Sequence, residues 1–466
     1  MLDCKITPND PRCRRETDSA SIQCAVDLAA ALGIRSVTVP RVNERTGEPI
    51  WNLDRAVILP SEMEIVLDNC HLRQADGSFD NLFRNFAEPK AQGHTAAEQM
   101  RNIVIRGVGN AILDGGVHNG LTQKNSLKDG MPHISRNSLI FLYNLRDFVL
   151  EGFELRDHRY WAVNLIHAER GRLSDLRLNG QCDCRNQDGI DLRVGCSNLI
   201  LERITGQTGD DVIALSAIGN SENEASMAGR FPVEGHDEDI HDIIIRDVIA
   251  TSVECTVIAL RNSDGRKIYN ITMDNIHCND NYAYRDGNRY PEYPRFKLFR
   301  ENLLHRVRRS NMPYALIRMG QDGFFGKRNA VLGELYNIHA SNLHAHLGAV
   351  IVANVAMENC YFGNIYAEND VDYIITTKSE RETQVFGADL KNVVIENVFY
   401  DNRDNDYATA FDFSKNQRNF GVEQVLIRRA FLGNCKTIFN LQCDGEISYC
   451  DLFGAHVENS SGVAGK

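Results

Sequence analysis

The sequence predicts an all-β protein, a single parallel β-helix (a solenoid of short strands) with a helix capping its N-terminal end. Three observations favour this fold. Short apolar, β-rich runs recur along most of the chain, separated by Asn, Gly, Asp and Ser. Related runs recur at a constant spacing, which is typical of repeat architectures. One stretch with helical spacing precedes the series of strands.

The helical stretch lies in "TDSASIQCAVDLAAALGIRSVTVP", residues 17–40. Asp18 or Ser19 can cap its N-terminus, and Gly33 is a typical stop. The following "SVTVP" alternates as a strand does. We therefore expect residues 1–40 to form an N-terminal cap region, because a solenoid needs a cap on its open end. The apolar residues at helical spacing are Ile22, Val26, Ala29 and Leu32.

The repeat period can be measured from related runs. "GIDL" begins at Gly189, and "VIAL" begins 23 residues later at Val212 and again 45 residues after that at Val257. Three short strands and their turns fit into about 23 residues at about 3.3 Å per residue, which makes one coil of a β-helix. An antiparallel sandwich or barrel also contains many short strands, but the recurrence favours the solenoid. We expect residues 1–466 to form one domain.

Three segments depart from the repeat. Residues 218–240 are polar and acidic, residues 279–312 are rich in Tyr, Phe and Arg, and residues 457–466 form a polar tail. Insertions in solenoids tend to lie on one face, often the binding face. The alternative is that they are variable surface decoration.

Composition narrows the classes of function. The 466 residues carry a net charge of −12, which argues against a nucleic-acid partner. No run of 18 apolar residues predicts a membrane span, and the N-terminus lacks an apolar core of the signal-peptide type. We expect a cytoplasmic protein, unless a leader has been trimmed from a secreted one. The 13 scattered cysteines favour reduced structural thiols over metal ligands.

Four aspartates gather where two coils should meet. Asp188 precedes "GIDL" and Asp211 precedes "VIAL", so we expect them to stack on adjacent coils, with Asp210 beside them and Asp191 close. The alignment rests on apolar pairs that should point into the core. These pairs are Ile190 with Leu192, Ile213 with Leu215, Ile258 with Leu260 and, more loosely, Ala315 with Ile317. The same alignment predicts an outward column of Arg193, Ser216, Arg261 and Arg318.

Such a cluster of carboxyl groups suits acid–base chemistry. Like charges held close raise the pKa of at least one group, so one carboxyl can act as an acid while another acts as a base. Two carboxyls in these roles meet the requirement for hydrolysis of a glycosidic bond. The arginine column can hold an anionic group such as a uronate. Two alternatives are a calcium site and aspartates that only satisfy turn amides.

These motifs carry a family resemblance. "RNQDGIDL" and "GQTGDDVIAL" resemble the N-T-D-G and G-D-D signatures of polygalacturonase-like glycoside hydrolases, family 28, within the pectate-lyase-like superfamily. The resemblance spans roughly residues 15–330 and is most specific over 150–217. It implies a right-handed parallel β-helix and hydrolysis with inversion, and it requires no metal or other cofactor. The implied general acid is Asp210, the pair that activates water is Asp188 and Asp211, and Asn186 matches the Asn of the first signature.

The chain departs from the family pattern at two places. Thr256 stands where the family has a histidine, and Leu316 stands where it has an arginine, with Arg318 in place of a lysine. We therefore expect a substrate other than ordinary polygalacturonan. Arg193 and Arg261, helped by His236, would form a rearranged anion site.

We expect an inverting hydrolase of an acidic, pectin-like poly- or oligosaccharide. One rival is a polysaccharide lyase or epimerase on the same fold, with an Arg or Lys base and often calcium. The other is a non-catalytic carbohydrate-binding solenoid. The sequence leaves the sugar, the linkage and the oligomeric state open.

Overall fold

The structure is a computed structural model of the chain, and it divides into two compact units. The first unit holds the described residues up to Asp210 together with residues 231–237, and the second holds Asp211–Ile218 and the described residues from Glu238 onwards. The structure describes residues 6–87, 95–116, 134–180, 186–218, 231–252, 255–278, 314–320, 328–378, 388–402, 408–414 and 420–454.

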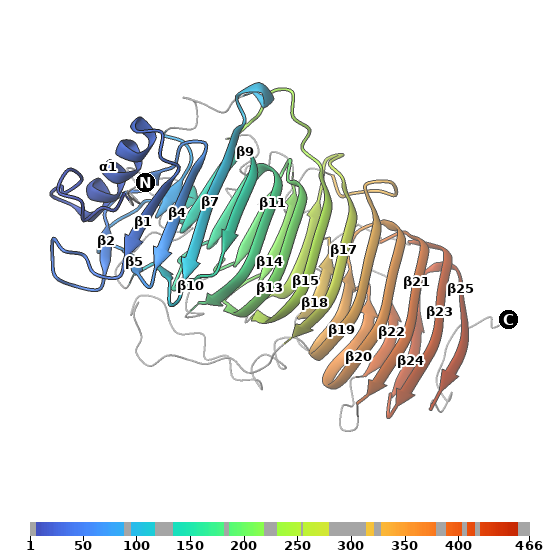
Figure 1. Cartoon of the computed structure of the whole chain (residues 1–466). Helices are drawn as coiled ribbons and strands as arrows, with labels where there is room; N and C mark the ends of the chain where they lie inside the picture. The colour runs from blue at the N-terminus through green and yellow to red at the C-terminus, as the bar shows by residue number, and fades with distance from the viewer. Residues whose placement is uncertain are drawn as a thin grey trace. The chain divides into compact units, whose positions relative to one another are not determined.

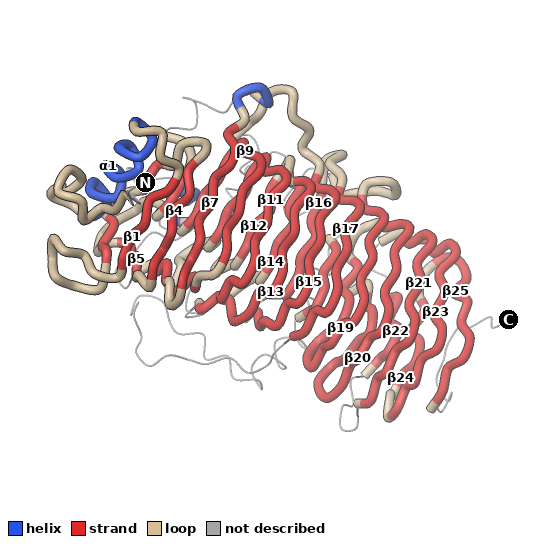
Figure 2. The backbone as a smooth tube through the Cα atoms, in the orientation of Figure 1, coloured by secondary structure: helices blue, strands red, loops and turns tan. Residues whose placement is uncertain are grey.

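Apart from its loops and turns, the first unit consists mainly of β-strands (Figure 2). It begins with one α-helix, and short 3₁₀ turns lie at Ala96–Glu98 and Ile134–Asn137. Its elements are α1 (Asp18–Ala31), β1 (Ser36–Pro40), β2 (Trp51–Leu53), β3 (Val57–Ile58), β4 (Met63–Asp68), β5 (His71–Gln74), β6 (Phe83–Arg84), β7 (Met100–Val108), β8 (Ile112–Asp114), β9 (Ile140–Glu151), β10 (Glu154–Arg156), β11 (Val163–Asn179), β12 (Ile190–Arg193) and β13 (Ser197–Thr208).

Strands of the first unit form stacks in which every pair is parallel, and the chain returns to each stack after passing through the others (Figure 1). One stack runs β1, β4, β7, β9, β11, β13. A second runs β2, β5, β8, β10 and the end of β11. A third runs β3, β6 and then the starts of β9 and β11, followed by β12.

The N-terminal helix lies where the sequence predicts it, but its cap differs. The N-cap is Thr17, whose side chain accepts a hydrogen bond from the Ala20 amide at 3.2 Å. Asp18 is instead buried, and its carboxylate accepts a hydrogen bond from the Asn52 amide at 2.7 Å. The prediction that Asp18 or Ser19 caps the helix was therefore wrong, because both side chains instead accept hydrogen bonds from backbone amides distant in sequence.

The second unit is also made of parallel stacks. One runs β14, β16, β18, then the ends of β19 and β20, then β22 and β24; the other runs β15, β17, β19, β20, β21, β23, β25. Its strands are β14 (Ile213–Ala217), β15 (Ile240–Ser252), β16 (Thr256–Asn262), β17 (Ile268–Cys278), β18 (Ala315–Met319), β19 (Leu335–Ala353), β20 (Met357–Thr376), β21 (Leu390–Asp401), β22 (Thr409–Phe413), β23 (Gly421–Gly433), β24 (Thr437–Leu441) and β25 (Asp444–Phe453).

In the long strands β19, β20 and β21, asparagines adopt the left-handed backbone region and bend the strand. Asn342, Asn364 and Asn397 have φ of 55°, 53° and 54°, values that Asn tolerates better than most residues. Their side chains form a ladder: Asn397 Nδ2 donates to Asn364 Oδ1 at 3.0 Å, and Asn364 Nδ2 donates to Asn342 Oδ1 at 3.1 Å. The asparagines that separate the apolar runs in the sequence thus hold adjacent strands in register.

The core of each unit consists of inward-facing aliphatic side chains. β4 shows the alternation expected of a half-buried strand, with Met63, Ile65 and Leu67 buried and their neighbours partly exposed. The all-β prediction is therefore confirmed. Within the described residues, no helix is long and apolar enough to cross a membrane. Most of the predicted insertion at 218–240, all of that at 279–312 and the tail at 457–466 lie outside the described residues.

Candidate active site

In the first unit, the pairing of β11 with β12 places the predicted site residue Asp188 just before the start of β12. Val163 of β11 pairs with Ile190 of β12, and the Ala162 amide donates to the Asp188 carbonyl at 3.0 Å. Asp188 therefore lies just before β12, in the same position that Trp161 occupies just before β11. The side chain of Asp188 is only 5% exposed.

The carbonyl of Gln187 brings Asp210 close to Asp188. It accepts hydrogen bonds from the amides of Gly209 at 3.1 Å and Asp210 at 3.2 Å, so the loop after β13 lies against the residue that precedes Asp188. The Gln187 side chain donates in turn to the His158 carbonyl at 2.6 Å. Asp210 keeps partial exposure to solvent. The backbone of the predicted acid therefore lies next to the residue that precedes Asp188, and the acid itself is partly exposed.

Asp191 and Arg193 extend this group along β12. Arg193 Nη1 lies 3.9 Å from Asp191 Oδ1, and its guanidinium carbon lies 4.7 Å from the centre of the Trp161 ring. An arginine over an aromatic face gains cation–π attraction and is held in one orientation. The first unit therefore brings together Asp188, Asp191, Arg193 and Asp210, and it adds Trp161.

His236 lies in this unit, with a carboxylate partner. Its Nε2 is 2.5 Å from Glu169 Oε1, and its ring is 4.8 Å from that of His167. Burial lowers the pKa of His167 to about 3, and the nearby His236 contributes to this shift. Burial likewise lowers the pKa of His158 to about 4. The imidazoles of His158 and His167 are therefore neutral at neutral pH.

Asn186, matched by resemblance to the first signature, adopts a left-handed backbone with φ of 56° and is partly buried. Asn and Asp tolerate this conformation better than other non-glycine residues. Its backbone therefore serves the turn that leads into Asp188. Its part in binding substrate stays a prediction.

In the second unit, Asp211 is paired with Arg261. Asp211 Oδ2 lies 2.5 Å from Arg261 Nη1, and the two residues are 1% and 9% exposed. The predicted register of β14 and β16 is confirmed, with Ile213 opposite Ile258 and Ser216 opposite Arg261.

Arg318 occupies a different position from the one predicted. It pairs with Ala259, two residues before Arg261, and Ile317 rather than Ala315 lies opposite Ile258. A shift of two residues leaves the same side chains facing inward, so the apolar pattern cannot distinguish the two registers. Arg318 still shares the face of Arg261, but it lies two residues nearer the start of the strand, and it is 1% exposed.

The carboxyl groups of the predicted site are also more buried than expected for side chains on an outward, solvent-exposed face. Asp191 and Asp211 are each 1% exposed, and strands β12, β14 and β16 are buried on both faces. Alternation along a short strand identifies opposite faces, but it does not show whether other residues cover one of them. At Thr256, where the resemblance expects a histidine, the hydroxyl donates to the Ala315 carbonyl at 2.7 Å.

An aromatic cluster beside the first-unit site was not predicted. Phe231 and Val233 pack onto it from the segment after β14, and Tyr160 stacks on Trp161 with ring centres 4.5 Å apart. The only signal in the sequence was "RYW" directly before an apolar strand. The members of the cluster are Phe86, Phe141, Tyr143, Tyr160, Trp161, Ile166, Val194, Phe231 and Val233.

Comparison with known proteins supports the resemblance. No family model matches the chain. Over 150 residues it is 29% identical to a putative galacturan 1,4-alpha-galacturonidase C of Aspergillus niger, covering 29% of this chain. The chain spans about a third of the length of that relative, 34%. This similarity confirms the resemblance to polygalacturonase-like glycoside hydrolases.

Two solved structures are similar along most of the chain. A tailspike protein of E. coli bacteriophage HK620, in complex with a pentasaccharide, has a TM-score of 0.55 at 11% identity, covering 97% of this chain and 78% of its own. This likeness concerns the fold alone. A family 28 exopolygalacturonase of Yersinia enterocolitica has a TM-score of 0.47 at 14% identity, covering 96% of this chain and 77% of its own.

Proposed function

We propose that the protein is a glycoside hydrolase that cleaves a uronate-containing, pectin-like poly- or oligosaccharide with inversion. The observation that carries the proposal is the pair of hydrogen bonds to the Gln187 carbonyl, which holds the Asp210 backbone against the residue before Asp188. Similarity to a galacturonidase, though limited to part of both chains, supports the same class of reaction.

The roles follow from exposure and position. Asp210, the carboxyl with access to solvent, delivers a proton to the leaving oxygen. Asp188 is buried in the first unit and Asp211 in the second, and the resemblance assigns to these two carboxylates the activation of the attacking water on the opposite face of the sugar. Direct attack by water yields the inverted anomer.

The substrate's negative charge would be held by arginine. Arg193 is fixed over Trp161, and its fork can bind a uronate carboxylate in a bidentate manner. Arg261, Arg318, Asn186, Asp191 and His236 complete the proposed binding residues. Because Arg261 already pairs with Asp211, its role is to orient the catalytic carboxylate as well as to attract the anion.

We further propose that both units are coils of a right-handed parallel β-helix. Recurrent parallel pairing within each unit supports this assignment. Parallel strands joined by crossover connections are right-handed in nearly all known cases.

The test is hydrolysis of a glycan panel that includes oligogalacturonides and neutral oligosaccharides, followed by an assay for new reducing ends. We expect activity on a uronate-containing member and a fall of about 10²–10⁴-fold in kcat for Asp210→Asn, since general acid catalysis contributes on that order. Proton NMR of the fresh product should show the inverted anomer.

The matched control is Asp175→Asn, which has the same chemical change at an exposed residue that pairs with Arg203 at 2.7 Å. Its φ of 55° suits asparagine. We expect wild-type turnover from this variant. Full activity of Asp210→Asn, or a wild-type protein that binds glycans and hydrolyses none, would contradict the proposal.

A further inference from the structure

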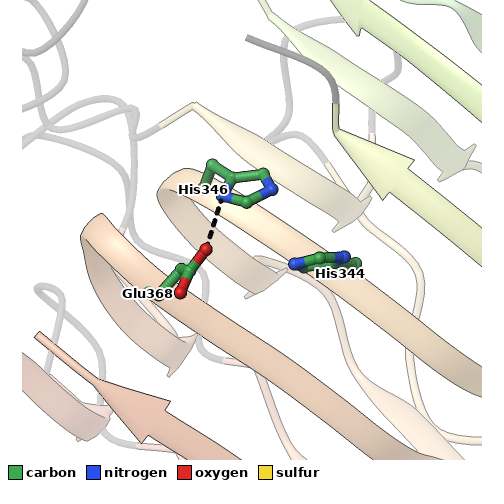
Figure 3. A group of neighbouring side chains, drawn as sticks. All are labelled: His344, His346 and Glu368. Atoms are coloured by element: carbon green, nitrogen blue, oxygen red, sulfur yellow. Dashed lines mark ion pairs between the residues drawn. The ribbon is translucent and has the colours of Figure 1, made fainter.

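A second cluster of polar side chains lies in the second unit, on the long strands β19 and β20 (Figure 3). It consists of His344 and His346 from β19 and Glu368 from β20. The nitrogen or oxygen atoms that the three residues offer lie within 4.8 Å of one another. These residues were not predicted from the sequence, although "HAH" followed by a glutamate on the next strand is a signal that could indicate them.

The backbone explains why the three side chains meet. Residues i and i+2 of a strand point to the same side, so the two imidazoles share a face. Their ring centres are 4.5 Å apart. The register of β19 and β20 shifts between Ala345 and Leu347, which leaves Glu368 beside His346. Irregularities of this kind often redirect side chains at functional sites.

Contacts around the cluster orient its members. His346 Nδ1 lies 3.3 Å from Glu368 Oε1, the interaction drawn in Figure 3. The Tyr366 hydroxyl donates to the other carboxylate oxygen, Glu368 Oε2, at 3.1 Å. A hydrogen bond to the second oxygen fixes the carboxylate, as outer partners of metal ligands commonly do.

His344 supplies the observation that points to a ligand. Its Nε2 is buried and has no hydrogen-bond partner among the residues that the structure describes. The neighbouring rings of His277 and Tyr366 both meet His344 edge to face. Buried polar nitrogens of native proteins nearly always have a partner, so an atom bound here would complete the group.

We propose that His344, His346 and Glu368 bind one divalent transition-metal ion, with Zn²⁺ as the preferred physiological cation. Two imidazole nitrogens and one carboxylate oxygen form a donor set that suits Zn²⁺ and disfavours Ca²⁺ and Mg²⁺, which take oxygen ligands. Three protein ligands leave a position for water or another molecule. The side chains of His346 and Glu368 are 25% and 31% exposed, which gives an ion access from solution.

The experiment is calorimetric titration of Zn²⁺ into the chelator-treated full-length protein, with metal content measured on the purified protein. We expect one high-affinity Zn²⁺ per chain. His344→Gln and Glu368→Gln should each weaken binding at least about tenfold, since removal of even an outer partner costs 10–100-fold. Mg²⁺ and Ca²⁺ at the same concentration should not compete.

His339→Gln is the matched control, because His339 lies on the same strand, stacks on Tyr361 and belongs to no such cluster. It should bind Zn²⁺ as the wild type does, and circular dichroism should show all variants folded. The absorption spectrum of a Co²⁺-loaded sample gives a second readout, which His344→Gln should change. Absence of stoichiometric binding, or wild-type affinity in both cluster variants, would overturn the proposal.

Discussion

The carboxylate of Asp211 is held inside the second unit by the guanidinium of Arg261, and both residues are nearly inaccessible to solvent. Removing one partner of a buried ion pair leaves an uncompensated charge, which costs far more than the pair itself contributes. The stability of the folded chain should therefore depend on Arg261 in a way that surface arginines do not share.

We expect Arg261→Met to lower the free energy of unfolding by about 3–5 kcal/mol. The double variant Asp211→Asn with Arg261→Met should recover part of that loss, because the charge that has no partner is then gone as well. Chemical denaturation of the single and double variants measures both effects.

Arg170→Met provides the contrast, since Arg170 pairs with Asp147 at 2.7 Å where the two side chains are 49% and 39% exposed. Exposed pairs contribute about 0–1 kcal/mol. Equal losses from the two arginine variants would show that Asp211 does not depend on its partner.

At the scale of elements, the asparagine ladder of Asn342, Asn364 and Asn397 links three consecutive strands of one stack. Asn364 is its middle member and makes a side-chain hydrogen bond on each side. Asn364 thus has two structural functions: its backbone bends the strand, and its side chain forms part of the ladder.

Asn364→Ala should remove both functions and lower the free energy of unfolding by about 1–3 kcal/mol. Alanine is strained in the left-handed backbone region, and the variant also loses the side-chain hydrogen bonds. Asn364→Gly loses only the hydrogen bonds, because glycine adopts positive φ at little cost. Thermal unfolding should rank wild type above the glycine variant and the glycine variant above alanine. Alanine at or above glycine would mean that the bend carries no strain.

Helices and strands could be predicted from the sequence better than the burial and contacts of their side chains. The N-terminal helix, the first strand and the register of β14 with β16 followed from apolar spacing alone. The register of Arg318 did not, because a two-residue shift preserves the buried face. The burial of Asp191 and the packing of Phe231 on Trp161's cluster depend on segments distant in sequence, which periodicity does not report.

The residues of the candidate sites also fall into two groups, those that could be predicted from the sequence and those that could not. Asp188 and Asp211 were predicted because each directly precedes a related motif at an equivalent point of the repeat, and Asp210 because it lies next to Asp211. Trp161 and Glu169 were missed because their importance lies in what they contact, Arg193 and His236 respectively. The pair of histidines and the glutamate of the proposed metal site require an irregular register that no repeat pattern indicates.

At the scale of the whole molecule, two buried imidazoles should make the fold sensitive to acid. The pKa of His158 is lowered to about 4 and that of His167 to about 3, both chiefly by burial. His158 lies near the backbone of Gln187 and Asp188, while His167 faces His236, whose partner is Glu169. Neither ring nitrogen of His167 has a hydrogen-bond partner in the described part of the chain.

Below pH 6.5 the unfolded chain binds protons that the folded chain does not, so stability falls as the pH is lowered towards the two folded values. Each imidazole contributes at most about 1.4 kcal/mol per pH unit in that window. We expect the unfolding free energy to decrease between pH 6.5 and pH 4. His167→Asn, which suits the local φ of 48°, should flatten the slope, and an unchanged slope would exclude His167 as a cause.

Phe231 and Val233 follow β14 in the chain, yet they complete the aromatic cluster of the first unit. A nascent chain that has emerged only as far as Asp210 therefore lacks the residues that cover Phe86, Phe141 and Tyr143. Until translation has passed residue 233, those rings stay available to chaperones or to other nascent chains. We therefore expect the first unit to complete its aromatic cluster only after residues 231–233 have been synthesised.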